Sequence, residues 1–230
     1  MSNLTKKQKI IQEKHDPEKT YSLEEAMDII QSVKSEKFDE SIDISVKLGV
    51  DPDKSDQNVR GAVTLPNSLG KEVKVAVFAD GDHASDAQAA GAEYVGMDDL
   101  AEKFQKDEVN VDVVISTNSA MKVVGKLGQV LGPKGLMPNP KTGTVSDDVA
   151  TAIKNVKAGQ VRFRTDKNGI IHGSIGKVSF EGNKIKANAS ALLEELRKLK
   201  PASAKGVYIG NIALSSTMGP GVKINPGELV

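Results

Sequence analysis

The sequence has no cysteine and no tryptophan, and aromatic residues make up only 3% of its 230 positions. Without cysteine, the chain can form no disulfide, no thiolate metal site and no cysteine nucleophile. Because aromatic side chains are so scarce, aliphatic residues must fill the interior, and a hydrophobic fraction of 38% supports only small cores. A prior of about 150 residues per domain allows one large domain or two small ones.

Long apolar runs are also lacking. No run approaches the roughly 20 residues of a membrane span. The basic start MSNLTKKQKIIQEKHDPEK has neither the apolar core nor the cleavage site of a signal peptide. We therefore expect a cytoplasmic protein with no membrane partner.

The net charge of zero conceals an uneven distribution. Residues 1–119 carry 14 basic and 24 acidic side chains, whereas residues 120–230 carry 17 and 7. A polarised charge suggests a polyanion bound on the basic side. Two halves that attract each other would give the same pattern, so charge leaves both interpretations open.

The N-terminal part predicts an α+β arrangement. A polar, partly ordered arm over residues 1–20 precedes a capping box in which Ser22 is the N-cap and Glu25 lies three residues on. The apolar spacing that follows predicts a helix over 23–33. Alternating apolar and polar residues over 42–48 predict a half-buried strand with one polar face.

Residues 59–65 predict a second strand in the N-terminal part. The C-terminal part repeats this style, since residues 160–165 and 170–175 predict a hairpin around an Asn-Gly turn. A basic last turn followed by proline predicts a helix over 189–200, and residues 206–217 predict the final strand.

The middle of the chain alternates strands and short helices, which is typical of a small parallel α/β unit. We expect strands over 73–79, 94–95 and 111–116, and helices over 84–90, 98–106, 118–127 (capped by Asn118) and 149–156.

The simplest arrangement of these styles is an insertion. We predict a discontinuous α+β domain of residues 1–68 and 159–230, with an α/β domain of residues 69–158 inserted into it. The split domain has a net charge of +3 and the insert −3. The split domain is therefore the better candidate to bind a polyanion, though only mildly.

The loop over residues 132–145 is the most unusual segment. Three prolines fix φ and three glycines permit positive φ, so the loop should be rigid and present Lys134 and Lys141. A phosphate-binding P-loop is excluded because no Gly-Lys-Ser/Thr follows at the needed spacing. The loop is either a stiff connection or a contact to a phosphate backbone.

Two further segments suit RNA. The hydroxyls and glycines over 215–221 would let an RNA backbone approach closely, although the segment could be a simple terminal turn. Phe38 could stack on a base if it is exposed, but a buried phenylalanine is commoner.

Catalysis finds no support in the sequence. His15, His83 and His172 lie far apart, and no spacing resembles a metal site, a nucleophile site or a carboxylate pair. The turn at Asp80 and Gly81, after a buried strand, leaves a nucleotide-binding enzyme as an alternative, although no Gly-x-Gly-x-x-Gly is present. A protein-interaction adaptor is a third possibility.

The chain resembles the bacterial large-subunit ribosomal protein one family, the protein of the mobile stalk beside the tRNA exit site. The resemblance rests on the loop 132–145, the segment SDQNVRG at 55–61 and the ending Thr217-Met218-Gly219-Pro220. It runs nearly end to end, through residues 91–96 and 157–159.

The resemblance implies a split α+β RNA-binding domain with an inserted Rossmann-like α/β domain, joined by a double hinge. It implies a structural protein, a monomer when free, with no cofactor or metal. The expected partners are 23S rRNA in the stalk, deacylated tRNA leaving the exit site, and the protein's own messenger, whose translation it represses.

The resemblance also implies which residues contact RNA. They lie at the entry to the first strand, on the predicted hairpin and after the predicted last strand: Lys37, Phe38, Glu40, Ser41, His172, Thr217, Met218 and Gly219. A second group is expected to form the hinge or to touch RNA: Ser68, Lys134, Lys141 and Gly159.

Overall fold

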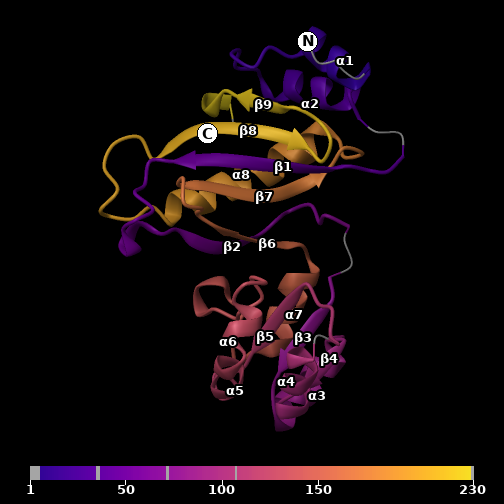
Figure 1. Ribbon diagram of the computed structural model, residues 1–230, viewed down its shortest axis with the longest axis vertical. Coiled ribbons are helices and arrows are strands. Elements are labelled where there is room, and N and C mark those ends of the chain that lie inside the picture. Colours follow the sequence, from indigo (N-terminus) through magenta and orange to yellow (C-terminus); the bar gives the residue numbers. More distant parts are fainter. Residues whose placement is uncertain (1–5, 35–36, 71–72, 107, 229–230) are drawn as a thin grey trace. The chain divides into compact units, whose positions relative to one another are not determined.

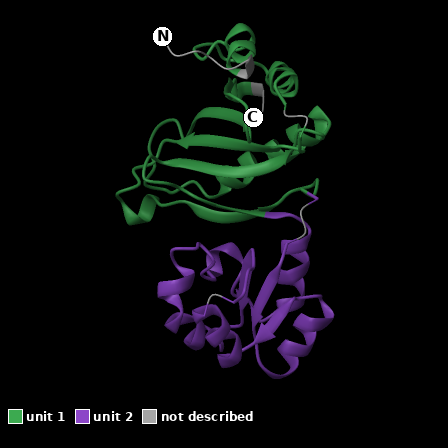
Figure 2. Ribbon diagram, turned by 45° about the vertical axis from the view of Figure 1, so that its right-hand side comes forward, with its two compact units in different colours: residues 1–69, 161–230 green, residues 70–160 purple. Residues whose placement is uncertain are grey.

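The computed structural model describes residues 6–34, 37–70, 73–106 and 108–228. The chain forms two compact units (Figure 2): unit 1 is residues 1–69 with 161–230, and unit 2 is residues 70–160. Both units combine helices with sheets, which confirms the mixed α/β class. Within the described ranges, no helix is long and apolar enough to cross a membrane.

Unit 1 contains a four-stranded antiparallel sheet in the order β7-β1-β8-β9 (Figure 1). Its strands are β7 (Ile170–Lys177), β1 (Ser41–Leu48), β8 (Ile209–Ser216) and β9 (Gly221–Ile224). The inner strand β1 comes from the start of the chain and its neighbours come from the end. This sheet therefore joins both ends of the chain in one structure.

Two helices cover one face of this sheet. Helix α2 (Leu23–Ser32) and helix α8 (Gly182–Lys198) share one core with the four alternate residues of β1 that are buried. The capping box is confirmed, since Glu25 N–H donates to Ser22 Oγ at 3.1 Å and Ser22 N–H donates to Glu25 Oε2 at 3.0 Å. The other face of β1 carries its polar residues, as the alternation predicts.

The predicted hairpin is wrong in its pairing. Strand β6 (Gln160–Arg164) pairs with β2 (Arg60–Thr64) in a separate two-stranded ribbon, whereas β7 joins the large sheet. Beside the turn the two segments are linked by a bridge between Thr165 and Ile171 and by donation from Asp166 N–H to Ile170 O at 2.9 Å. The turn itself is present, with Gly169 at φ +72°. The Asn-Gly pair correctly predicted the turn, but the two strands that flank it pair with strands of different sheets.

Unit 2 contains a three-stranded parallel sheet in the order β4-β3-β5. One core lies between the sheet and helices α4, α5 and α6, and a second lies between the sheet and helices α3 and α7. The elements are β3 (Val75–Phe78), α3 (Gly81–Ala89), β4 (Tyr94–Gly96), α4 (Asp98–Gln105), β5 (Val113–Ser116), α5 (Met121–Lys126), α6 (Gly128–Leu131) and α7 (Val149–Lys157).

Four further predictions need correction. Asn118 does not cap α5, because the N-cap is Ala120, which has no side-chain cap, and the Asn118 side chain donates to Asp147 Oδ2 at 2.9 Å. Helix α8 begins at Gly182 rather than residue 189, and β8 is followed by β9. The predicted N-terminal arm contains helix α1 (Lys6–Lys14).

The loop over residues 132–145 is held together by hydrogen bonds within unit 2. Asn139 N–H donates to Thr144 Oγ1 at 2.8 Å, and Lys141 N–H donates to Asn139 Oδ1 at 2.9 Å. Ser116 N–H donates to Thr144 O at 3.0 Å, which extends the edge of β5. The expected rigidity therefore has a cause beyond its prolines. Short 3-10 turns occur at Ser55–Gln57, Pro140–Thr142 and Pro226–Glu228.

Candidate nucleic-acid interface

Two chain segments from opposite ends of the sequence meet where β1 begins and β8 ends. Ser41 N–H donates to Thr217 Oγ1, and Thr217 N–H donates to Ser41 O, both at 3.1 Å. We call this place, residues 37–41 with 217–219, the sheet corner. It brings together seven of the eight predicted RNA contacts.

Glu40 connects the two segments of the sheet corner. Its side chain is buried, and its Oε2 accepts the Met218 N–H at 3.2 Å. Its backbone carbonyl accepts the Val178 N–H at 2.9 Å, which ties the corner to the end of β7. Glu40 therefore holds the loop after β8 through its side chain and the end of β7 through its backbone.

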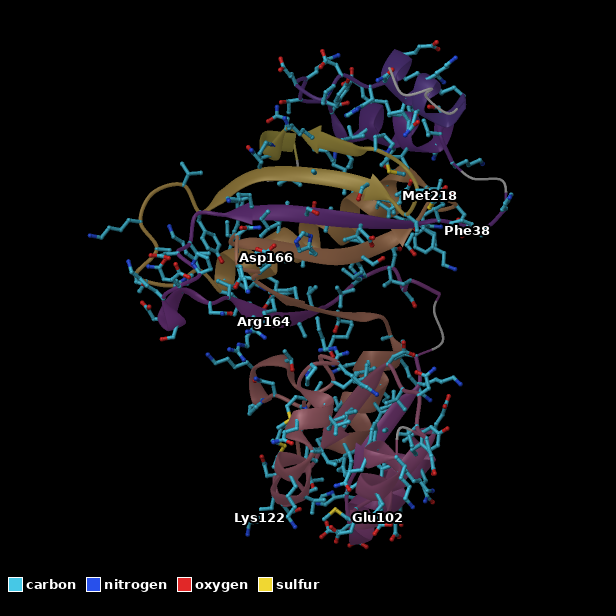
Figure 3. All side chains as sticks on the ribbon, viewed as in Figure 1. Phe38, Glu102, Lys122, Arg164, Asp166 and Met218 are labelled. Atoms are coloured by element: carbon cyan, nitrogen blue, oxygen red, sulfur yellow. The ribbon has the colours of Figure 1, made fainter. Side chains whose placement is uncertain are left out.

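Two large apolar side chains project from the sheet corner. Phe38 is 48% exposed and Met218 is 58% exposed, and Figure 3 shows both at the same end of the large sheet. The sequence left open whether Phe38 is exposed or buried, and the structure shows that it is exposed. An exposed ring and thioether beside the hydroxyls of Ser41 and Thr217 suit contact with bases and ribose.

Gly219 is required by close packing. A Cβ there would lie 2.4 Å from Ser216 Oγ, a separation that real Cβ atoms do not show. Gly219 N–H also donates to Ser216 O at 3.2 Å, which closes the turn. The Ser216 hydroxyl is buried and has no hydrogen-bond partner among the described residues.

The solvent face of the sheet adds polar groups that the site prediction missed. Residues on opposed positions of antiparallel strands share one face, so Asp43 lies between Ser174 and Ser215, and Ser45 lies beside His172. The alternation of β1 had already identified Asp43 and Ser45 as members of its polar face. Their places beside Ser174 and Ser215 depend on strand pairing, which the sequence alone did not reveal.

His172 lies on this face in β7. It is opposite Ser45, which is four residues after Ser41 in β1. Its Nδ1 is 3.2 Å from Ser45 Oγ, and its Nε2 is 3.3 Å from Asp166 Oδ2. Backbone N–H donation from Ile170, joined by Asn168 N–H and the His172 side chain, lowers the pKa of Asp166. The anionic carboxylate thus holds both the turn and the imidazole, an anchor that the sequence did not indicate.

The four predicted hinge residues do not belong to the sheet corner. Ser68 lies in unit 1, whereas Lys134, Lys141 and Gly159 lie in unit 2. Both lysines are exposed. Gly159 has φ +96° between α7 and β6 and so occupies a conformation that favours glycine. Their role as a hinge or as RNA contacts stays a prediction.

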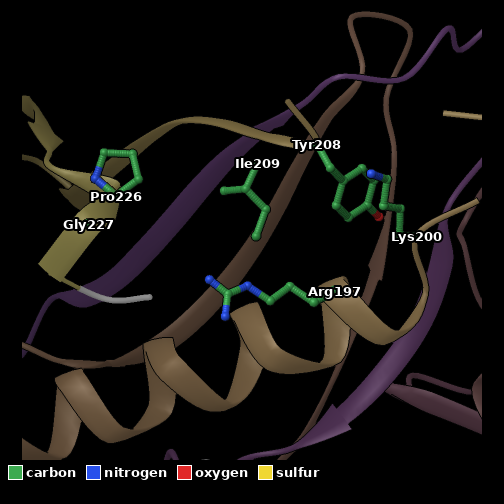
Figure 4. Close-up of a pocket in the computed structure, with 6 residues that line it drawn as sticks. All are labelled: Arg197, Lys200, Tyr208, Ile209, Pro226 and Gly227. Atoms are coloured by element: carbon green, nitrogen blue, oxygen red, sulfur yellow. The ribbon is translucent and has the colours of Figure 1, made fainter. Parts of the chain in front are cut away.

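A pocket elsewhere in unit 1 is shown in Figure 4. It is lined by Arg197, Lys200, Tyr208, Ile209, Pro226 and Gly227. Burial raises the pKa of the Tyr208 phenol to about 12, so this group stays neutral near neutral pH. No group of three or more His, Cys, Asp or Glu suited to a metal ion occurs among the residues that the structure describes.

Comparison with known proteins gives a consistent result over the whole chain. Residues 30–220 match the ribosomal protein L1p/L10e family. The large ribosomal subunit protein uL1 of Pseudoalteromonas atlantica is 57% identical over 229 residues, covering 100% of this chain and 98% of that protein. The proteins of the same name from Methylococcus capsulatus and Pseudomonas paraeruginosa are 58% and 59% identical, each covered over 99% of its length.

Proposed function

The chain belongs to the ribosomal protein L1p/L10e family, and from this premise we propose that it is a structural, non-enzymatic constituent of the large ribosomal subunit. Full-length relatives at 57–59% identity carry the name of a large-subunit protein, which supports this assignment. Its place of action is then the ribosome in the cytoplasm.

The proposed RNA-binding surface is the sheet corner together with the solvent face of β1, β7 and β8. The observation that carries this proposal is the pairing of Ser41 with Thr217, which sets exposed Phe38 beside exposed Met218. The RNA would be a bulged, looped region of 23S rRNA. Unit 1 would be the RNA-binding split domain, and unit 2 the inserted Rossmann-like domain.

Fit, more than charge, accounts for this binding. The split domain carries only +3, and Asp43 lies on the proposed RNA-binding face. Hydroxyls and carboxylates can hydrogen-bond to 2′-hydroxyls and base edges, and exposed apolar groups can stack. We therefore expect a preference for folded RNA over DNA of the same sequence.

The direct test is binding of a 23S rRNA stalk fragment to the full chain. Met218→Asp and Thr217→Ala should each weaken binding by about 10-fold or more, on the order of 1–3 kcal/mol per lost contact. Val207→Asp is the matched control, because Val207 is 78% exposed and precedes the opposite end of β8. Equal affinity of all four proteins for the fragment would sink the assignment.

Two further roles belong to the same proposal. The protein would assist the release of deacylated tRNA from the exit site, and it would repress its own messenger through a structure that resembles the rRNA site. The resemblance of the chain to its family supports both. Met218→Asp should relieve repression of a reporter that carries the messenger's leader, while Val207→Asp should repress as well as the wild type.

A further inference from the structure

Unit 2 has a basic segment inside an otherwise acidic sequence. Residues 69–158 have a net charge of −3, yet no Asp or Glu occurs between Asp112 and Asp147. This stretch contains four lysines, Lys122, Lys126, Lys134 and Lys141. It forms β5, α5, α6 and the proline-rich loop, and Figure 1 shows the helices and loop along one side of unit 2.

Helix α5 presents two of these lysines on one face. Lys122, Gly125 and Lys126 follow the i, i+3, i+4 spacing that places residues together on a helix, and all three are exposed. Val124, on the other side, is fully buried in the core. Among the described residues, no ion pair engages Lys122 or Lys126. We call Lys122, Gly125 and Lys126 the α5 face.

Neither positive φ nor close packing against the described residues requires glycine at position 125. It lies inside a helix with ordinary backbone angles, and a Cβ built on it meets nothing within 4 Å. By contrast, a Cβ on Gly132 would lie 2.6 Å from Gly128 O, and Gly135 has φ +69°. A helix is less stable with glycine than with alanine at an interior position. A backbone without a side chain is useful where a ligand must approach closely.

We infer that the α5 face is a second RNA-binding surface, which contacts the phosphate backbone of a folded RNA other than the one held at the sheet corner. Lysines bind phosphates without reading sequence, and the gap at Gly125 lets the backbone lie between them. Lys134 and Lys141 follow in the proline-rich loop of the same sequence stretch without Asp or Glu, and both are exposed. RNA is the expected polyanion because of the proposed ribosomal function, on which this inference rests.

The test uses the full chain saturated with the rRNA stalk fragment and titrated with a labelled RNA duplex. We expect a second binding event in the wild type. Lys122→Gln with Lys126→Gln should weaken it by about 10-fold at low salt and reduce the slope of log K against log salt by about two. The matched control is Lys103→Gln with Lys106→Gln, which removes the same charge from helix α4 and its end.

Gly125 separates a binding role from a structural one. Gly125→Gln leaves the charge unchanged and improves helix propensity. This substitution should raise the melting temperature of the protein. It should also weaken binding of the duplex about as much as the loss of one lysine does. A lower melting temperature with unchanged duplex affinity would show that Gly125 serves the fold, and would overturn this part of the inference.

The outcomes separate this inference from the proposed function. The α5 face is not a specific site if the rRNA fragment binds but the duplex does not. The same conclusion follows if the two double substitutions weaken duplex binding equally. If polyglutamate binds in place of the duplex and depends on Lys122 and Lys126, the partner is an acidic protein and the RNA assignment fails. If the duplex binds through α5 but the fragment does not bind, the sheet-corner function fails instead.

Discussion

Glu40 shows how a buried side chain can serve a surface. Glu40 is 1% exposed and its Oε2 accepts the Met218 N–H, so it supports the sheet corner from beneath. Removing one partner of a buried hydrogen bond costs about 1–3 kcal/mol. Family resemblance named Glu40 as an RNA contact, while the structure gives it a supporting position.

We predict that Glu40→Ala lowers the free energy of unfolding by about 2 kcal/mol and weakens the binding of the rRNA fragment. Glu40→Gln keeps an acceptor for the Met218 N–H and should retain most of both. Urea unfolding and fragment binding measure the two effects. Full affinity in Glu40→Ala would show that the buried carboxylate does not position the Met218 loop.

Ser216 and Gly219 should behave as a coupled pair. Gly219→Ala places a methyl group against Ser216 Oγ, and such overpacking costs about 1–3 kcal/mol. Ser216→Ala should be nearly neutral, because the buried hydroxyl has no partner among the described residues. In the double variant most of the lost stability should return, and a double-mutant cycle by urea unfolding measures this. Additive effects would contradict the close contact.

The turn between β6 and β7 depends on the charge of Asp166. Its carboxylate accepts the N–H groups of Asn168 and Ile170, both at 2.8 Å, and these bonds lower its pKa below 3.8. A lowered pKa means that the anion stabilises the folded state. That stabilisation is fully present above about pH 4 and is lost as the pH falls through the lowered pKa.

We therefore predict an acid-induced loosening of this turn. The amide chemical shifts of Asn168 and Ile170 should titrate together, with a midpoint below 3.8. In Asp166→Asn the same shifts should not depend on pH in this range, and His172 should lose its charged neighbour. A midpoint at or above the ordinary aspartate value would contradict the assigned hydrogen bonds.

At the scale of elements, the sequence predicted individual helices and strands but not which strands pair. The capping box and alternation predicted α2 and β1 because both signals lie within a few residues. The partner strands of β6 and β7 lie about 100 or more positions away in the sequence, so adjacent strands were wrongly paired. Strand β9 has four residues and alternates only twice, which is too short a pattern to distinguish from a tail.

The start of α8 was missed for a similar reason. Its first turns are polar, and Asn188 is fully buried there, with its Nδ2 donating to Ile175 O at 2.7 Å. A buried asparagine satisfied by strand β7 has no signature in helical periodicity. The hydrophobic pattern therefore placed the start of the helix at residue 189, seven residues late.

On the scale of the whole molecule, the sheet corner joins residues 176 positions apart, as in the pair of Ser41 and Thr217. Composition and periodicity predicted the strands that carry them but not their meeting. That meeting came from family resemblance, and the structure supplies the hydrogen bonds that hold it. The anchor at Asp166 and the solvent face around Asp43 required the strand register itself.

The chain leaves and re-enters unit 1 on neighbouring strands. Beta strands β2 and β6 are paired, and Thr165 N–H donates to Val59 O at 2.9 Å, so the end of β6 meets the start of β2. The two strands are therefore antiparallel, and the end of β2 lies beside the start of β6. Unit 1 also has a core of its own.

We predict that residues 1–69 joined to residues 161–230 by a short Gly-Ser linker fold without unit 2. The rRNA fragment should bind this shortened chain within about 10-fold of the full chain, because the sheet corner lies wholly in unit 1. Met218→Asp in the shortened chain controls for non-specific binding. A shortened chain that folds cooperatively but does not bind the fragment would show that unit 2 takes part in holding it.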